Sequence, residues 1–156
     1  MRPLAAFVAL ATSVALGLLA AGCGEPTVRV EPPHPTGAAA AVCQALSSAL
    51  PTKVLDGSAR VVQPSTPYAA AWGDPPILLR CGVDRPAKLR ASSECLMIDG
   101  VGWFSERATR GYIFTTVGRD AYVEVSVPSA YQPPSNALVD VAAAVRKAVP
   151  VRTPCV

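Results

Sequence analysis

Residues 95–104 read CLMIDGVGWF, and the pair Asp99-Gly100 separates two apolar runs at their centre. An Asp-Gly pair in this setting is the strongest short-range sign of a two-residue hairpin, because both central residues of a type I′ turn need positive φ. The facing pairs are then Ile98 with Val101 and Leu96 with Trp103, all on one face of the ribbon. The stretch therefore predicts an antiparallel hairpin whose four apolar residues share a face.

The neighbouring segments alternate as half-buried strands do. Residues 122–127 place Val123, Val125 and Val127 on one side, and a loop at 118–121 joins them to a preceding run at 112–117. Residues 77–82 (ILLRCG) place Ile77, Leu79 and Cys81 on one face and Arg80 on the other. A further short strand is expected around residues 60–63. These segments together predict a sheet of antiparallel strands.

Amphipathic helices are predicted on both sides of this strand-rich region. Apolar residues recur at helical spacing from Gly37 to Leu50, and a second helix follows Pro133-Pro134 with Ser135 as its N-cap. The core-facing side chains are expected to be Ala39, Val42, Cys43, Leu46 and Leu50, then Leu138, Val141, Ala142, Val145 and Val149. The predicted fold class is α+β, an antiparallel sheet of about four to six short strands flanked by N- and C-terminal helices on one face. Residues 37–156 are predicted to form this single domain.

Size and charge exclude several function classes. A chain of 156 residues and 16.1 kDa allows one compact domain and argues against two lobes with a catalytic cleft between them. The 14 Lys and Arg against 11 Asp and Glu give a net charge of +3, and the basic residues are scattered. We therefore expect no nucleic-acid partner.

The first 22 residues have the plan of an export signal, with Arg2, an uncharged apolar run and small residues before a cleavage site. Residues 19–23 (LAAGC) resemble the lipobox of bacterial lipoproteins, in which the cysteine sulfur is acylated and becomes the new N-terminus. We expect Cys23 to anchor an exported protein to the outer side of the cell membrane. An uncleaved transmembrane anchor is the alternative, because about twenty apolar residues can span a bilayer.

A proline-rich segment follows, which reads GEPTVRVEPPHP over residues 24–35. The four prolines favour extended backbone, so residues 23–36 are predicted to be a tether that holds the domain about 30 to 40 Å from the membrane. His34, the single histidine of the chain, falls in this tether. Catalysis by a histidine and a histidine-ligated metal are therefore not expected, and no cofactor is implied.

Four cysteines remain after Cys23, namely Cys43, Cys81, Cys95 and Cys155. An even set in an exported chain indicates two disulfides, for which three connectivities exist. The favoured pairs are Cys81 with Cys95, between neighbouring strands, and Cys43 with Cys155, between the terminal helices. A zinc site is the weaker alternative, because no pair has the CxxC spacing.

Several motifs carry a family resemblance. Residues 72–83 (WGDPPILLRCGV), Gly100-Val101-x-Trp103, residues 115–119 (TTVGR) and residues 123–128 (VEVSVP) resemble the signature of domain of unknown function (DUF) 3515, a secreted family of high-GC Gram-positive bacteria. The resemblance spans roughly residues 43 to 155. It implies an exported, often membrane-tethered envelope protein with no established activity.

The candidate ligand-binding residues are Trp72, Asp74, Arg80, Trp103 and Arg119. A tryptophan can stack on a sugar, the two arginines can bind a carboxylate or phosphate, and the aspartate can bind hydroxyls or amines. The structural alternative is that the tryptophans are core residues, Asp74 caps a turn and the arginines form ion pairs.

Three functions remain open. The favoured one is a non-catalytic binding or accessory module of the cell envelope, with a wall component or an envelope protein as its partner. The second is a structural or assembly partner, which predicts an exposed apolar patch. The third is a small hydrolase with two carboxylates drawn from Asp74, Glu94, Asp99 and Glu106, which requires a pair about 5 to 9 Å apart in one cleft.

Overall fold

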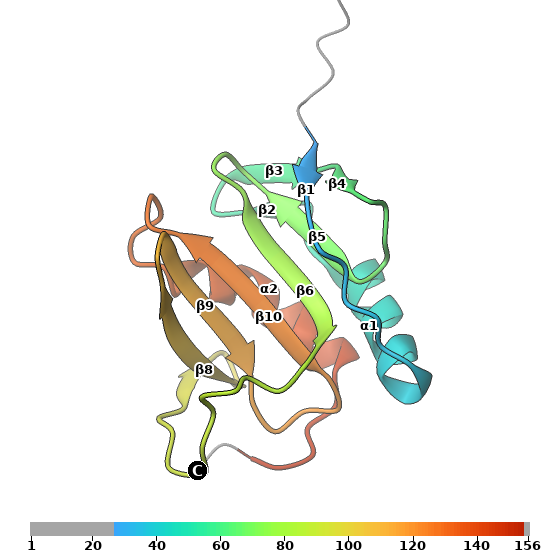
Figure 1. Ribbon diagram of the computed structural model, residues 1–156, viewed down its shortest axis with the longest axis vertical. Coiled ribbons are helices and arrows are strands. Elements are labelled where there is room, and N and C mark those ends of the chain that lie inside the picture. The colour runs from blue at the N-terminus through green and yellow to red at the C-terminus, as the bar shows by residue number, and fades with distance from the viewer. Residues whose placement is uncertain (1–26, 155–156) are drawn as a thin grey trace, which may run out of the picture.

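The hairpin at Asp99-Gly100 is present in the computed structural model, which describes residues 27–154 (Figure 1). Strand β7 (Leu96–Ile98) pairs antiparallel with β8 (Val101–Ala108), and the facing residues are those predicted. The φ angles of Asp99 and Gly100 are 44° and 77°, both positive as a type I′ turn requires. The hairpin prediction is confirmed.

The second predicted hairpin is confirmed as β9 (Gly111–Thr116) and β10 (Tyr122–Pro128), and β10 pairs on its other side with β6 (Ile77–Val83). The three alternating valines of β10 and the three apolar residues of β6 are all buried. We call the face that carries them the inner face. Arg80 and Glu124, which are register partners, lie on the opposite, outer face.

The full sheet has eight strands in the order β2-β3-β5-β6-β10-β9-β8-β7, with all neighbours antiparallel. The remaining members are β2 (Lys53–Val54), β3 (Gly57–Arg60) and β5 (Ala69–Trp72). A separate parallel pair joins β1 (Val28–Arg29) to β4 (Val62–Gln63). The expected four to six strands are too few, because the extra ones are short. The sequence AAAW of β5 has little strand propensity of its own and is extended by pairing with β6.

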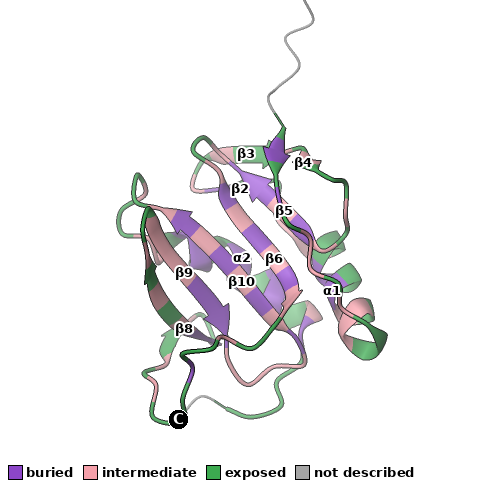
Figure 2. Ribbon diagram, in the orientation of Figure 1, coloured by how far each residue is buried: buried purple, intermediate pink, exposed green. Residues whose placement is uncertain are grey.

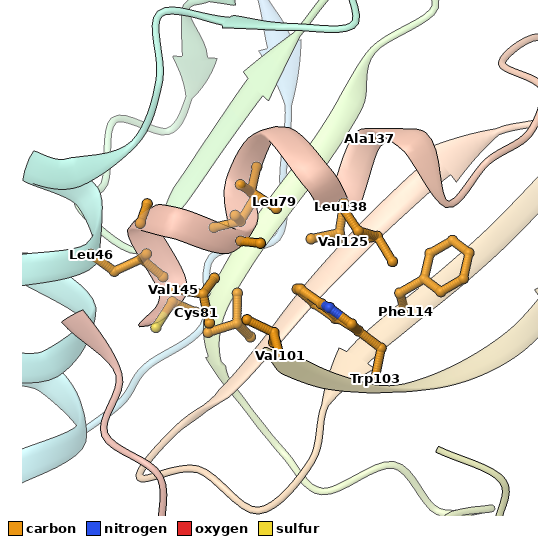
Figure 3. Close-up of a cluster of buried hydrophobic side chains, with 14 of the residues drawn as sticks. Leu46, Leu79, Cys81, Val101, Trp103, Phe114, Val125, Ala137, Leu138 and Val145 are labelled. Atoms are coloured by element: carbon orange, nitrogen blue, oxygen red, sulfur yellow. The ribbon is translucent and has the colours of Figure 1, made fainter. Parts of the chain in front are cut away.

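Both helices cover the inner face of the sheet (Figure 1). Helix α1 (Gly37–Ala49) packs along α2 (Asn136–Ala148), and all five core positions expected for the second helix are buried. In α1, Cys43 and Leu46 are buried, and Ala39, Val42 and Leu50 pack partly buried against the same core. Figure 2 shows the buried stripes on the central strands, and Figure 3 shows the core between helices and sheet.

A disulfide joins Cys43 of α1 to Cys81 of β6, with the two Cα atoms 5.5 Å apart. This corrects the favoured pairing, since Cys81 does not bond Cys95 and Cys43 does not bond Cys155. The reason is that the apolar face of α1 packs on the inner face of β6, which brings the two buried sulfurs together. Cys95 is also disulfide-bonded. Cys155, on which the prediction of a second bridge depends, lies outside the described residues.

Residues 28–36, here called the strap, lie against the outer face instead of standing free of the domain (Figure 1). Val28 and Val30 are buried, and the amide of Val28 donates to the carbonyl of Val61 at 2.8 Å. The extended backbone predicted from the prolines is present, but the two valines that alternate within it attach it to the fold. Residues before 27, including the predicted signal peptide and Cys23, lie outside the described residues. Neither helix between residues 27 and 154 is long and apolar enough to cross a bilayer.

Candidate functional site

The two tryptophans predicted to stack on a ligand are core residues. Trp72 is buried, and its indole Nε1 donates a hydrogen bond to the carbonyl of Pro51 at 2.9 Å. Trp103 is fully buried between α2 and the sheet (Figure 3). Neither ring has a free face, so the structure contradicts the stacking role and supports the structural alternative for both.

The turn that follows Trp72 is fixed from three sides. Arg60 Nη1 donates to the carbonyl of Gly73 at 2.8 Å, the hydroxyl of Tyr131 donates to the carbonyl of Pro75 at 2.8 Å, and the Gly73 amide donates to Ser58. Gly73 has a φ of 72°, and a Cβ there would lie 2.6 Å from the Tyr131 hydroxyl. The turn is therefore a packed structural corner, and the exposed Asp74 projects from it apart from the other candidates.

The guanidinium of Arg119 is hydrogen-bonded to backbone carbonyls. Its Nη1 donates to the carbonyl of Val149 at 2.6 Å, at the C-terminal end of α2, and its Nη2 donates to the carbonyl of Gly100 at 2.9 Å. Burial, and to a smaller extent the neighbouring charge of Arg146, lower the pKa of Arg119 below its ordinary value. Arg146 itself donates to the carbonyl of Asp99 at 2.6 Å. Both arginines thus hold the β7–β8 turn against α2, and no donor fork is presented to an anionic ligand.

Arg80 remains as a candidate, because it lies on the outer face beside a cavity. Its Nε and Nη2 donate to Glu124 Oε1 at 3.0 and 2.8 Å across neighbouring strands. Its Nη1 donates a longer bond of 3.4 Å to the carbonyl of Glu31 in the strap. The second carboxylate oxygen of Glu124 accepts no hydrogen bond from residues 27–154.

The cavity lies between the strap and the outer face and has a volume of about 470 Å³. It is lined by Glu31, Pro32, Pro33, His34, Arg80, Gly82, Val83, Asp84 and Glu124. The strap approaches the sheet closely at Gly82, where a Cβ would lie 2.5 Å from Pro35. The absence of a side chain at Gly82 therefore allows the strap to lie across β6, and the strap forms the roof of the cavity.

The lining is polar and carries more negative than positive charge. Three acidic residues, Glu31, Asp84 and Glu124, line it together with one arginine, Arg80, and with His34. No group of three His, Cys, Asp or Glu residues within the described part of the chain is arranged to hold a metal ion. Such a cavity can bind a group that donates hydrogen bonds or carries a positive charge.

Sequence reasoning missed most of this site because its residues come from three distant segments. The sequence predicts that His34 lies in a free tether, yet the structure places this residue at a cavity wall. The available signals were the alternation of Val28 and Val30, which is typical of a paired strand, and Gly82 beside the bridging Cys81.

The hydrolase hypothesis gains no support from the positions of its four carboxylates. Asp74 and Asp99 lie in the turns before β6 and β8, two strands that are separated in the sheet by β10 and β9. Glu106 on β8 pairs with Lys88 at 3.6 Å. Glu94 lines a different cavity, of about 260 Å³, at the end of β7. The structure brings no two of the four together in one of the described cavities.

An apolar patch lies at the β7 edge of the sheet. Met97 is 55% exposed and Val151 is 56% exposed, and both line a small cavity of about 180 Å³ with Gly102 and Val117. Leu96 on the same edge strand is also exposed. This patch is at the opposite edge of the sheet from β2 and β3.

The fold and the cavity define a class of protein: an α+β domain whose extended N-terminal strap borders a polar cavity on the outer face of an antiparallel sheet. Comparison with known sequences identifies the family of this chain. It belongs to the family described as "Protein of unknown function (DUF3515)", whose sequence profile matches residues 3–154 and so includes the strap. Neither the curated proteins nor the solved structures contain a match.

Proposed function

We propose that this protein is a non-catalytic binding module of the cell envelope, exported by its signal peptide and anchored to the outer side of the membrane through Cys23. The LAAGC sequence at residues 19–23 and the even set of later cysteines support export and anchoring. The cavity beneath the strap supports a binding role. Its ligand is a polar component of the envelope, such as a fragment of the wall or a segment of an envelope protein.

The charge of the residues that line the cavity indicates which chemical class of ligand it binds. Three carboxylates against one guanidinium give an excess of two negative charges among these four residues. The three guanidinium nitrogens of Arg80 are already bonded to Glu124 and Glu31. Carboxylate oxygens are therefore the groups left to bind a ligand. A ligand that offers an ammonium group or several hydroxyl donors fits them, whereas a phosphate or carboxylate meets repulsion.

A binding experiment with paired variants tests this site. The soluble form that begins at residue 24 is screened by thermal shift against muropeptides, wall saccharides, phospholipids and small metabolites. A ligand at 100 times its Kd stabilises the folded state by about 2.7 kcal/mol, which gives a clear rise in Tm. Asp84→Asn removes a carboxylate from the cavity, and Asp74→Asn is the matched control because Asp74 is an exposed carboxylate on the turn before β6.

We expect Asp84→Asn to weaken binding at least about tenfold, which is a loss of about 1.4 kcal/mol, and Asp74→Asn to leave it unchanged. The reverse result would move the site to the turn at residues 72–76. A hit that both variants bind with unchanged affinity would exclude the cavity.

The exposed apolar patch favours a second function, that of an assembly partner for another envelope protein. Leu96 and Met97 expose large side chains on the edge strand β7, and the exposed Val151 lines the same cavity as Met97. A partner strand can also add to this edge by backbone hydrogen bonds. Met97→Glu should then abolish capture of the partner in a pull-down from crosslinked envelopes. Val139→Glu is the matched control, because Val139 is 49% exposed on α2. Equal capture by both variants would contradict this second function.

A further inference from the structure

The first described residues of the chain are attached to one end of the molecule. The amides of Val28 and Val30 donate to the carbonyls of Val61 and Gln63 at 2.8 and 3.0 Å, and both valine side chains are buried. β1, β3 and β4 gather at this end, and residue 27 enters there (Figure 1). Any anchor that precedes residue 27 therefore acts on the domain at the β1–β4 end.

The covalent reach from the predicted anchor to this point is short. Four peptide units separate Cys23 from Thr27, and an extended chain spans at most about 3.6 Å per residue, so their Cα atoms are no more than about 14 Å apart. The distance of 30 to 40 Å expected of a free tether is therefore too large, because the strap belongs to the domain. A lipid on Cys23 would hold the β1–β4 end close to the headgroups.

The surface at this end has groups suited to a bilayer interface. Val61, whose carbonyl accepts the Val28 hydrogen bond, is 62% exposed and is the most exposed of the large hydrophobic side chains in the described residues. Arg29 is also exposed at this end, with Gln63 as its register partner in β4, and the exposed Glu31 lines the same shallow cavity as Arg29. An apolar side chain and a cation on one surface suit insertion between headgroups, with the guanidinium facing anionic lipid phosphates.

We propose that the surface formed by Arg29, Val61, Gln63 and Pro64 rests on the membrane and is held there by the short connection to Cys23. This inference relies on the lipid anchor of the proposed function. It also fixes the orientation of the protein. The β7 edge, with its apolar patch, points away from the membrane, and the cavity beneath the strap lies between the two ends.

The test uses the lipidated mature protein in nanodiscs that contain phosphatidylglycerol and a trace of gadolinium-chelating lipid. Paramagnetic relaxation of backbone amides reports distance to the headgroups and falls with the inverse sixth power of that distance. Seven strand spacings of about 4.8 Å put β7 about 34 Å from β2, and the β1–β4 pair lies at the β2–β3 end of the molecule (Figure 1). We therefore expect relaxation at Arg29, Val61 and Gln63 at least about tenfold stronger than at Met97. Uniform relaxation, or a maximum at Met97, would overturn the inference.

A linker variant tests the geometric cause. Eight Gly and Ser residues inserted between Gly24 and Glu25 raise the reach to about 43 Å, and we expect relaxation at Val61 to fall at least by about half. Unchanged relaxation would refute the role of the short connection. Mass spectrometry of the membrane-extracted protein separates the two proposals. A chain without diacylglyceryl at Cys23 defeats the anchor, whereas a lipidated chain without the relaxation gradient defeats only the orientation.

Discussion

At the scale of single residues, the family motifs have mainly structural roles. Trp72, Leu79 and Trp103 fill the core, Cys81 bonds Cys43, and Arg119 bonds two backbone carbonyls. A sequence shows that a tryptophan or an arginine is present, but its exposure depends on which distant segment packs over it. The candidate site could therefore be predicted only in part, and of its five residues Arg80 alone lines the cavity beneath the strap.

Gly82 provides the sharpest test of how the strap is seated. Gly82 has a φ of 84°, and the Cβ of an alanine at this position would lie 2.5 Å from Pro35. Gly37 also has a positive φ, of 55°, but the Cβ of an alanine there would meet no atom within 4 Å. Both substitutions carry a backbone cost of about 1–2 kcal/mol. We expect Gly82→Ala to lower the free energy of unfolding by about 1–3 kcal/mol more than Gly37→Ala, because the strap must shift. Urea denaturation measures both, and equal losses would show that the strap does not lie on Gly82.

A substitution of Arg119 tests whether this residue stabilises the fold. Its two hydrogen bonds join the end of α2 to the β7–β8 turn, and hydrogen bonds from charged groups contribute about 1.5–3 kcal/mol each before solvent screening. Arg119→Ala should therefore lower the free energy of unfolding by about 1–3 kcal/mol. Arg85→Ala, at an exposed loop position, should change it by less than about 0.5 kcal/mol. Similar melting curves for the two variants would contradict the assignment of Arg119.

At the scale of secondary-structure elements, the sequence predicts what local patterns determine. Both helices, the two hairpins and the facing pairs around Asp99-Gly100 follow from apolar spacing and turn chemistry. β5 could not be found in this way, because its sequence AAAW has no β-branched residue and becomes a strand only by pairing with β6. The disulfide pairing was also inaccessible, since it depends on how α1 packs against β6.

The Cys43–Cys81 bridge is expected to matter for stability. It joins α1 to the central strand β6 over a sequence separation of 38 residues, for which the chain-entropy account gives about 4 kcal/mol. A Cys43→Ala, Cys81→Ala double variant should lose stability of this order, measured by guanidinium denaturation against the oxidised protein. A loss below about 1 kcal/mol would mean that the bridge adds little to the packing of α1.

The second bridge follows by elimination. Cys95 is disulfide-bonded, Cys43 and Cys81 bond each other, and Cys23 is expected to carry lipid, so we predict that Cys95 pairs with Cys155. Trypsin places the four cysteines on separate peptides, at residues 30–53, 81–88, 91–107 and 153–156. Mass spectrometry without reduction should show the first joined to the second and the third to the fourth. A link between 81–88 and 91–107 would contradict the structure.

At the scale of the whole molecule, the strap connects the separate parts of the account. It roofs the polar cavity, contacts β6 through Pro35 and Gly82, and fixes the end of the domain nearest the predicted anchor. If the strap were free, the cavity would lose a wall. The predicted anchor would then no longer hold the β1–β4 end close to the membrane. The central claim is therefore that residues 28–36 are part of the folded domain.

Hydrogen exchange at the amides of Val28 and Val30 tests that claim most directly. Both amides donate to carbonyls of the β4 segment, so we predict exchange at least about tenfold slower than in an isolated peptide of residues 24–36, which supplies the unfolded rates. Exchange of both amides at the peptide rate would show a free tether. That result would contradict the roofed cavity and the membrane-facing end together.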